Sequence, residues 1–287
     1  MKTILVATDF SERSDRAVRR ASRLARQSGA CITLVHVVDD DQPERIVGVE
    51  KDEAQRLLDQ LTAQLREGGD IVCDTRVVLA SPFVGIAEAA AEMAPDLLVL
   101  GSHRRQVLGD IFVGTTAERT IRSVTCPVLM ANAATEEPYR HILHTTDLSN
   151  GSRDALRRFA ALELGAEATK SLLYVYDAPA LRLAMRHVLS QDDQADYVVG
   201  EHDEARRDLA EFAAAAGLDG FPQIAQHNDS VPSQEILKAA AQAQADLIVL
   251  STHSRGGLAR MLIGSVTEQV LRSSPVDVLV MPPVRGT

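Results

Sequence analysis

Two segments of the sequence, 101–118 and 251–268, have the residue types of a phosphate-binding loop. In each, a small residue ends a β-rich run, a polar loop follows, and a glycine with a hydroxyl residue opens a helical pattern. The free backbone N–H groups at such a helix start can hold a phosphate. The candidate binding residues are Gly101, His103, Gly114 and Thr115 in the first segment, and Ser251, His253, Ser254, Gly264, Ser265 and Val266 in the second.

A second interpretation of the same helix starts needs no ligand. Thr115 with Glu118, and likewise Ser265 with Glu268, have the spacing of a capping box, in which side chains satisfy the free N–H groups. The local pattern alone favours this cap. Capping and phosphate contact are nevertheless compatible, because the glycine before each hydroxyl residue lets a ligand approach the remaining N–H groups.

A carboxylate follows the first predicted strand of each half. Asp9 and Asp147 stand in the related segments VATDFS and HTTDLS. Either could bind a ribose or a base edge, although Asp at a strand-to-helix turn is often only an N-cap. Val37 and Val175 also follow strands, and in open α/β sheets ligands bind beyond the carboxyl ends of the strands. Because carboxylate, glycine-bearing loop and hydroxyl meet at this edge twice, we predict a ligand site there.

The remaining polar residues do not indicate catalysis. His103 and His253 could act as acid–base groups, but no carboxylate stands in a recognisable orienting position. His141 and His144 have metal-like spacing, yet residues three apart on a strand face opposite sides, so we expect a buried or edge histidine instead. The sequence has no P-loop, nucleophile elbow, H-E-x-x-H, G-x-G-x-x-G or adenylation motif. We therefore predict that the protein is neither an enzyme nor a metal protein.

The elements that must position these residues occur twice. Equivalent residues of the two halves are 138 positions apart as far as Val175, and 150 positions apart from Pro232 onward. The second copy therefore has 12 extra residues. We place this insertion within 178–200, where residues 180–189 have the pattern of an added helix. Each copy alternates β-rich runs with helical patterns; the runs of the first lie near 3–8, 31–38, 71–79, 96–101 and 127–131. This pattern predicts an α/β fold of two tandem, doubly wound, parallel five-stranded sheets flanked by helices.

The join between the copies is short and polar, so we predict touching domains at 1–134 and 139–287. The 287 residues carry 30 Lys and Arg against 40 Asp and Glu, a net charge of −10. This charge disfavours nucleic acid and anionic membrane as partners. The three widely spaced cysteines fit neither a disulfide framework nor a zinc site, and a reduced, cytoplasmic location is expected.

Taken together, these residues resemble tandem universal stress proteins of the universal stress protein A type, over almost the whole chain. ATP-binding members of that family carry G-x-x-G-x9-G-[S/T] after the fourth strand, an Asp after the first, and after the second a hydrophobic residue whose backbone reads adenine. The matching positions are Asp9, Val37, Gly101, Gly114 and Thr115 in the first copy, and Asp147, Val175, Gly264 and Ser265 in the second. The resemblance implies an adenine nucleotide alpha hydrolase-like fold.

The sequence departs from the family motif in both copies. Arg104 stands at the second glycine of the first copy, where its bulk fills the phosphate space or its guanidinium pairs with the phosphates. Ser251 and Ser254 replace the first two glycines of the second copy, which is a mild change because a hydroxyl can donate to phosphate. The second copy keeps two glycines and two arginines within 255–260. We therefore expect the second site to bind nucleotide better.

The resemblance implies a cytoplasmic, non-catalytic stress-response protein that binds ATP or another adenine nucleotide, with or without Mg²⁺, at one or both copies. It also implies that the last strands, near 127–130 and 276–280, pair across the domains and make the chain a pseudo-dimer; a further homodimer stays open. Two alternatives remain. One is a scaffold without nucleotide, favoured by the missing glycines, and the other is a slow nucleotide hydrolase or transferase that uses His103 or His253.

Overall fold

The computed structural model describes residues 1–68, 71–101, 116–133, 137–178, 191–218, 220–252 and 263–283, with the backbone alone for 191–196. The first half contains β1 (Thr3–Ala7), α1 (Glu12–Ser28), β2 (Cys31–Val38), α2 (Glu44–Glu67), β3 (Cys73–Leu79), α3 (Pro82–Met93), β4 (Leu97–Gly101), α4 (Thr116–Ser123) and β5 (Val128–Ala131). The second half contains β6 (His141–Thr146), α5 (Asn150–Leu162), β7 (Thr169–Tyr176), α7 (Gln191–Ala216), β8 (Gln223–His227), α8 (Pro232–Gln242), β9 (Leu247–Ser251), α9 (Ser265–Ser273) and β10 (Asp277–Met281).

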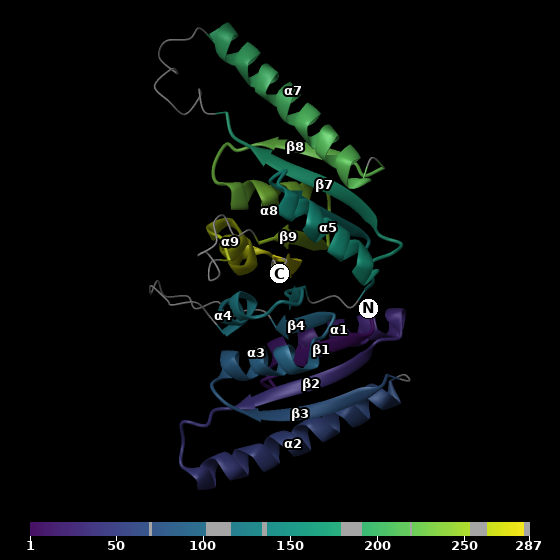
Figure 1. Cartoon of the computed structure of the whole chain (residues 1–287), viewed down its shortest axis with the longest axis vertical. Coiled ribbons are helices and arrows are strands. Elements are labelled where there is room, and N and C mark those ends of the chain that lie inside the picture. Colours follow the sequence, from purple (N-terminus) through teal and green to yellow (C-terminus); the bar gives the residue numbers. More distant parts are fainter. Residues whose placement is uncertain are drawn as a thin grey trace.

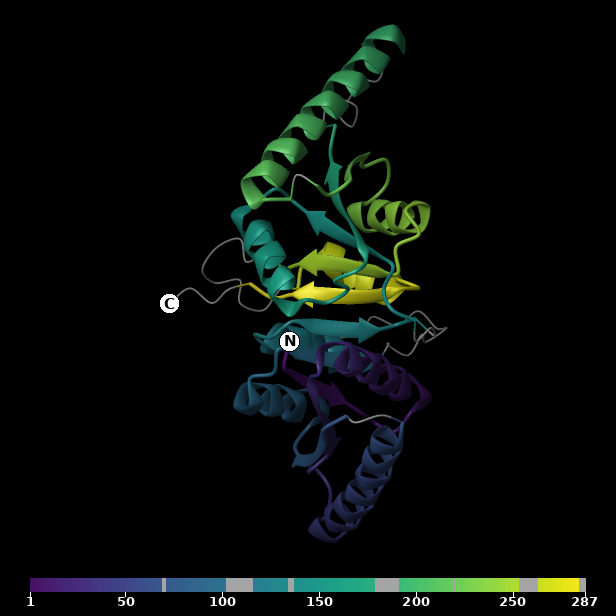
Figure 2. The ribbon, with the colours of Figure 1, turned by 90° about the vertical axis from the view of Figure 1, so that its right-hand side faces the viewer.

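The strands form one continuous sheet in the order β3-β2-β1-β4-β5-β10-β9-β6-β7-β8. All neighbours are parallel except β5 and β10, which pair antiparallel with Leu129 opposite Leu279. The α/β class and the five parallel strands of each half are confirmed, and so is the pairing of the last strands across the halves. Figures 1 and 2 show the two halves end to end, with α2 and α7 at opposite ends of the long axis.

Helices cover both faces of the sheet. Helices α1, α2 and α5 pack on one face over buried residues such as Ile32 and Ile142, while α3, α4, α8 and α9 pack on the other over residues such as Val35 and Leu98. The strand residues 97–100 and 247–250 are all less than 5% exposed. This burial explains why their sequences are apolar without alternation. The added helix predicted at 180–189 lies outside the described residues; α7 begins at Gln191.

The same turn leads from strand to helix at the start of each half. Phe10 and Leu148, 138 positions apart, both have left-handed backbone angles, with φ of 59° and 63°. The next residues, Ser11 and Ser149, cap α1 and α5 by accepting a hydrogen bond from the N–H three residues later. A left-handed φ is unfavourable for any residue that has a Cβ. The repeated turn is therefore a specific feature of both halves, placed at the carboxyl end of the first strand.

The two halves meet around an approximate two-fold axis. Arg272 of α9 donates to Glu118 of α4 at 2.7 and 3.2 Å, and Arg122 of α4 lies 3.7 Å from Glu268 of α9. The partners of one pair stand 150 positions from those of the other, as a self-complementary contact requires. The pseudo-dimer that the resemblance implied is thus present in the packing.

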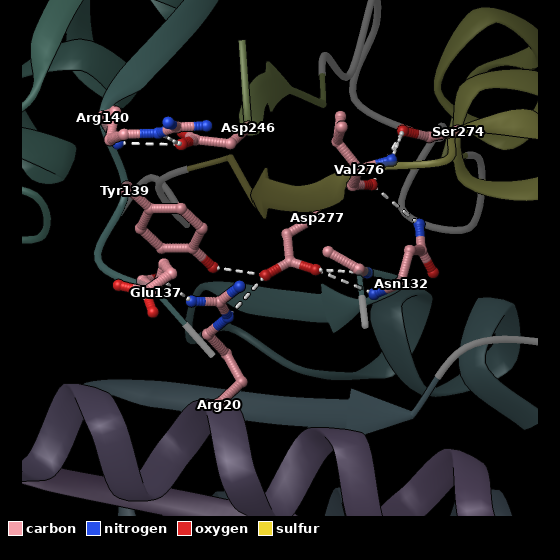
Figure 3. A network of polar contacts seen from close by, with 10 residues as sticks. Arg20, Asn132, Glu137, Tyr139, Arg140, Asp246, Ser274, Val276 and Asp277 are labelled. Carbon is pink, nitrogen blue, oxygen red and sulfur yellow. Dashed lines mark hydrogen bonds and ion pairs between the residues drawn. The ribbon is translucent and has the colours of Figure 1, made fainter. Parts of the chain in front are cut away.

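One network at this join has no counterpart in the described part of the other half. Asp277, which is fully buried, accepts hydrogen bonds from Tyr139 at 2.6 Å and from the backbone N–H groups of Asn132 and Ala133, both at 2.9 Å. The guanidinium of Arg20 lies 2.7 Å from the same carboxylate and 4.5 Å from the centre of the Tyr139 ring, and Figure 3 shows it between Glu137 and Asp277. The position in the first half that corresponds to Asp277 is Pro127. The two sides of the join are therefore chemically different.

Candidate functional site

A pocket of about 490 Å³ lies in the first half, at the carboxyl ends of β1, β2 and β4. This volume is within the usual range of ~300–1,000 Å³ for small-molecule sites. Three of the residues expected from sequence line it: Asp9, Val37 and Gly101. The structure brings them together because parallel strands end at one edge of the sheet. The other lining residues are Ala7, Thr8, Ser11, Arg13, Ser14, Val35, His36, Pro82, Ile86, Leu100, Thr116 and Ala117.

Asp9 is held by the turn that it helps to form. One carboxylate oxygen, Oδ1, accepts from the backbone N–H of Ser11 at 3.1 Å and from its hydroxyl at 2.5 Å. Burial raises the pKa of Asp9, but hydrogen bonds from Ser11 and Ser14 and the charge of Arg13 outweigh this effect and lower the pKa overall. The carboxylate is therefore ionised at neutral pH, and it presents an acceptor for a hydroxyl or amine donor in the pocket.

Gly101 has a steric role in addition to its place at the pocket. A Cβ on this residue would lie 2.6 Å from the carbonyl oxygen of Arg13 and 2.9 Å from the backbone nitrogen of Ser14, at the start of α1. The glycine thus lets the first turn of α1 approach the end of β4. From the sequence, Gly101 was expected only in the phosphate loop, whereas the nearest atoms to a Cβ at this position belong to the first turn of α1.

In the second half, Ser251 stands at the position of Gly101, and the hydrogen bonds around the aspartate differ. Ser152 donates to the carboxylate of Asp147 at 2.7 Å, and the hydroxyls of Ser152 and Ser251 are 3.0 Å apart. Because a carboxylate only accepts, this direction makes Ser251 the donor to Ser152. The hydroxyl hydrogen of Ser251 is therefore directed to Ser152 in α5. Donation from Ser251 to a phosphate stays a prediction, and it would require the hydroxyl to rotate. Val175 lies on the neighbouring strand β7, paired with Gln226.

The capping box expected at Ser265 and Glu268 is wrong. The N-cap of α9 is Gly264, with φ 87° and ψ 137°, and no side chain of the described residues caps the helix. The Glu268 carboxylate instead accepts from Arg272 at 2.6 Å and lies near Arg122 of the other half. The first N–H groups of α9, on Ser265 and the following Val266, consequently have no side-chain cap in this part of the structure.

Several predicted site residues lie outside the described part of the chain. They are His103, Gly114 and Thr115 of the first loop, and His253 and Ser254 of the second. Their roles stay predictions, as does the greater affinity expected of the second site, which rests on the same loop.

The two histidines of β6 do not share a ligand. His141 places its ring nitrogens 2.6 Å from the carbonyl oxygen of Ala243 and 2.8 Å from the hydroxyl of Ser171. His144 is only 1% exposed and packs edge-on against Phe159. The expectation of buried or edge histidines is confirmed. Within the described ranges, no cluster of three His, Cys, Asp or Glu residues is arranged to hold a metal ion.

Further polar residues, which were not predicted from the sequence, surround the two aspartates. Thr8 and Ser14 are linked by a hydrogen bond of 3.1 Å beside Asp9, and His36 lines the same pocket. Ser152 is the counterpart of Ser14, 138 positions later. That repeated serine, three residues beyond the N-cap, is a signal that could have identified them.

Comparison with known proteins agrees with this architecture. The family model described as "Universal stress protein family" matches residues 1–132 and 138–282. The chain belongs to the universal stress protein family. A universal stress protein of Mycolicibacterium smegmatis is 25% identical over 98% of this chain and 97% of its own length. The chain thus matches this tandem-sized relative along nearly its full length.

Two solved structures share the tandem fold of this universal stress protein. A protein of unknown function from Pseudomonas aeruginosa superposes with a TM-score of 0.70 at 21% identity, covering 99% of this chain and 93% of that one. A universal stress protein from Archaeoglobus fulgidus gives a TM-score of 0.70 at 18% identity, covering 98% and 96% of the two chains. Among the described helices, none has the length and apolar character needed to cross a bilayer.

Proposed function

We propose that this universal stress protein binds ATP or another adenine nucleotide, with the first-half pocket as one site and the equivalent edge of the second half as the other. The observation that carries the proposal is the pocket of about 490 Å³ at the carboxyl ends of β1, β2 and β4. It combines apolar walls, suited to a base, with an ionised carboxylate on Asp9 that can accept from a ribose hydroxyl or a base amine.

The start of α9 supports the second site. Gly264 has φ 87°, and a Cβ built on it would meet no described protein atom within 4 Å. The space beside the uncapped N–H groups of Ser265 and Val266 is therefore open to an anion. Mg²⁺ would accompany the phosphates of ATP. We propose binding without turnover, since the sequence offers no assignable general base or arginine finger.

The first test is direct. Protein purified without added nucleotide is denatured, and the released small molecules are quantified by mass spectrometry. About one or two adenine nucleotides per chain are expected if binding is tight. Should none be found and ATP produce neither heat in calorimetry nor a thermal shift, the result favours the scaffold alternative. ATP turnover above a buffer control would instead establish the enzyme alternative.

Asp9→Asn tests the first pocket. The amide keeps an oxygen for the N–H of Ser11 but loses the charge and places N–H donors where the carboxylate accepted. We expect ATP affinity at this site to fall about tenfold or more, because a charge-assisted hydrogen bond is worth roughly 1.5–3 kcal/mol. Calorimetric titration measures the change, with Asp40→Asn in an exposed loop as the control. Equal affinities for the two variants would remove Asp9 from the site.

Gly264→Val tests the second site. The branched side chain should occupy the space proposed for phosphate and abolish binding there, while the positive φ strains the backbone. Gly217→Val is the matched control, because Gly217 has φ 72°, also has open space around its Cβ position, and directly follows the last residue of α7. One binding event per chain should be lost in the Gly264 variant alone. Loss of binding in both variants would show that strain, and not the phosphate site, is responsible.

A further inference from the structure

His36 links the ends of two strands beside the pocket. Its Nδ1 lies 2.8 Å from the carbonyl oxygen of Thr8, and its ring stacks on Phe10 with centroids 4.5 Å apart and 28° between the planes. A carbonyl oxygen only accepts, so Nδ1 must carry a hydrogen. Asp9 lies between the two residues that His36 contacts. The imidazole therefore holds both ends of the short turn that presents the Asp9 carboxylate.

This turn needs to be held. Phe10 has φ 59°, a conformation that a residue with a side chain adopts only when its surroundings stabilise it. The N–H of Phe10 donates to the Thr8 hydroxyl at 3.1 Å, which fixes the turn locally. The contacts of His36 connect the turn to β2, where Val37 lines the pocket.

The corresponding turn of the second half has different contacts. Tyr174 stands 138 positions after His36, and Leu148 takes the place of Phe10. Within the described residues, Tyr174 makes no hydrogen bond to Thr146, and its ring packs at 6.4 Å from that of Tyr176. There Ser152 donates to the Asp147 carboxylate at 2.7 Å, and Ser251 contacts Ser152 in turn. Among the residues that the structure describes, a histidine braces this turn in the first half and not in the second.

We propose that His36 is a positioning residue of the first nucleotide site, which rests on the function proposed above. It fixes the turn of Thr8, Asp9 and Phe10 against β2, so that the Asp9 carboxylate is already placed when the nucleotide arrives. Preorganisation of this kind increases affinity because less ordering is left to occur on binding.

Two substitutions separate the hydrogen bond from the stacked ring. His36→Phe keeps an aromatic ring against Phe10 but has no donor for Thr8. His36→Asn loses the ring, yet its amide nitrogen stands the same number of bonds from the backbone as Nδ1 and can donate to the same oxygen. Tyr174→Phe, at the equivalent position of the second half, is the matched control. ATP is titrated in the Gly264→Val background, so that the first site is measured alone.

We expect His36→Phe to weaken ATP binding about fivefold to tenfold and to speed amide exchange across residues 7–14, while His36→Asn stays within about threefold of the parent. Tyr174→Phe should change neither quantity. A Phe variant with parental affinity and parental exchange would overturn the proposal, as would an Asn variant as weak as the Phe variant. If the parent protein binds no ATP, the proposed function fails, and the exchange of residues 7–14 still shows whether His36 holds the turn.

Discussion

Replacing Arg20 with methionine is expected to lower the free energy of unfolding by about 3–5 kcal/mol, the usual cost of leaving a buried charge without its partner. The Asp277 carboxylate is fully buried and lies 2.7 Å from the Arg20 guanidinium, which is itself 3% exposed. Arg20 also donates to the carbonyl oxygen of Glu137 and lies over the Tyr139 ring. Urea unfolding at pH 7 measures the change.

Arg158 provides the control, because it occupies the equivalent place in the second half, 138 positions after Arg20. Its guanidinium donates to the carbonyl oxygens of Pro282 and Thr125 and has no buried carboxylate beside it in the described structure. Arg158→Met should therefore cost only about 1 kcal/mol. Arg20→Met combined with Asp277→Asn should recover part of the loss, since no buried charge remains. If Arg20→Met and Arg158→Met lower the free energy of unfolding equally, the Arg20–Asp277 ion pair does not stabilise the join.

The second large effect concerns His144. Neither ring nitrogen of this buried side chain has a hydrogen-bond partner among the described residues, and burial together with the charge of Lys170 lowers its pKa from 6.5 to about 3. The first half has Val6 at this position. His144→Val should stabilise the protein at pH 7 by about 1–2 kcal/mol, because it removes an unsatisfied polar group from the core.

The benefit of this substitution should grow as the pH falls. The unfolded chain binds a proton at His144 near pH 6.5, whereas the folded chain does so only near pH 3. Protonation thus favours the unfolded state, and stability present above pH 6.5 is lost as the pH falls between these values, at up to about 1.4 kcal/mol per pH unit. Urea unfolding of both proteins at pH 7, 6 and 5 measures the difference.

His141→Gln is the control for this experiment. His141 lies on the same strand, but both of its ring nitrogens are within hydrogen-bond distance of a partner. Its replacement should lower stability at pH 7, in contrast to His144→Val. A constant gap between wild type and His144→Val from pH 7 to pH 5 would show that His144 is not kept neutral by the fold.

The local pattern of the sequence was enough to predict the strands and helices and their order along the chain. Uninterrupted apolar runs such as 97–100 predicted strands buried on both faces, and the structure places them in the interior of the sheet. The duplicated spacing indicated two equivalent halves and put Asp9, Val37 and Gly101 at one edge. These properties follow from backbone periodicity and from the rule that parallel strands end together.

Tertiary structure decided which polar group each side chain meets. The spacing of Ser265 and Glu268 predicted a cap, but Glu268 pairs with arginines, one of them from the other half. The hydrogen of Ser251 goes to Ser152, 99 positions away in sequence. His36 contacts the carbonyl oxygen of Thr8, 28 positions away in sequence, because their strands are neighbours in the sheet. The sequence by itself determined the fold, the repeat and the edge of the sheet at which the candidate site lies. The partners of these side chains depend on distances set by packing between segments far apart in the chain, and only the folded structure determined them.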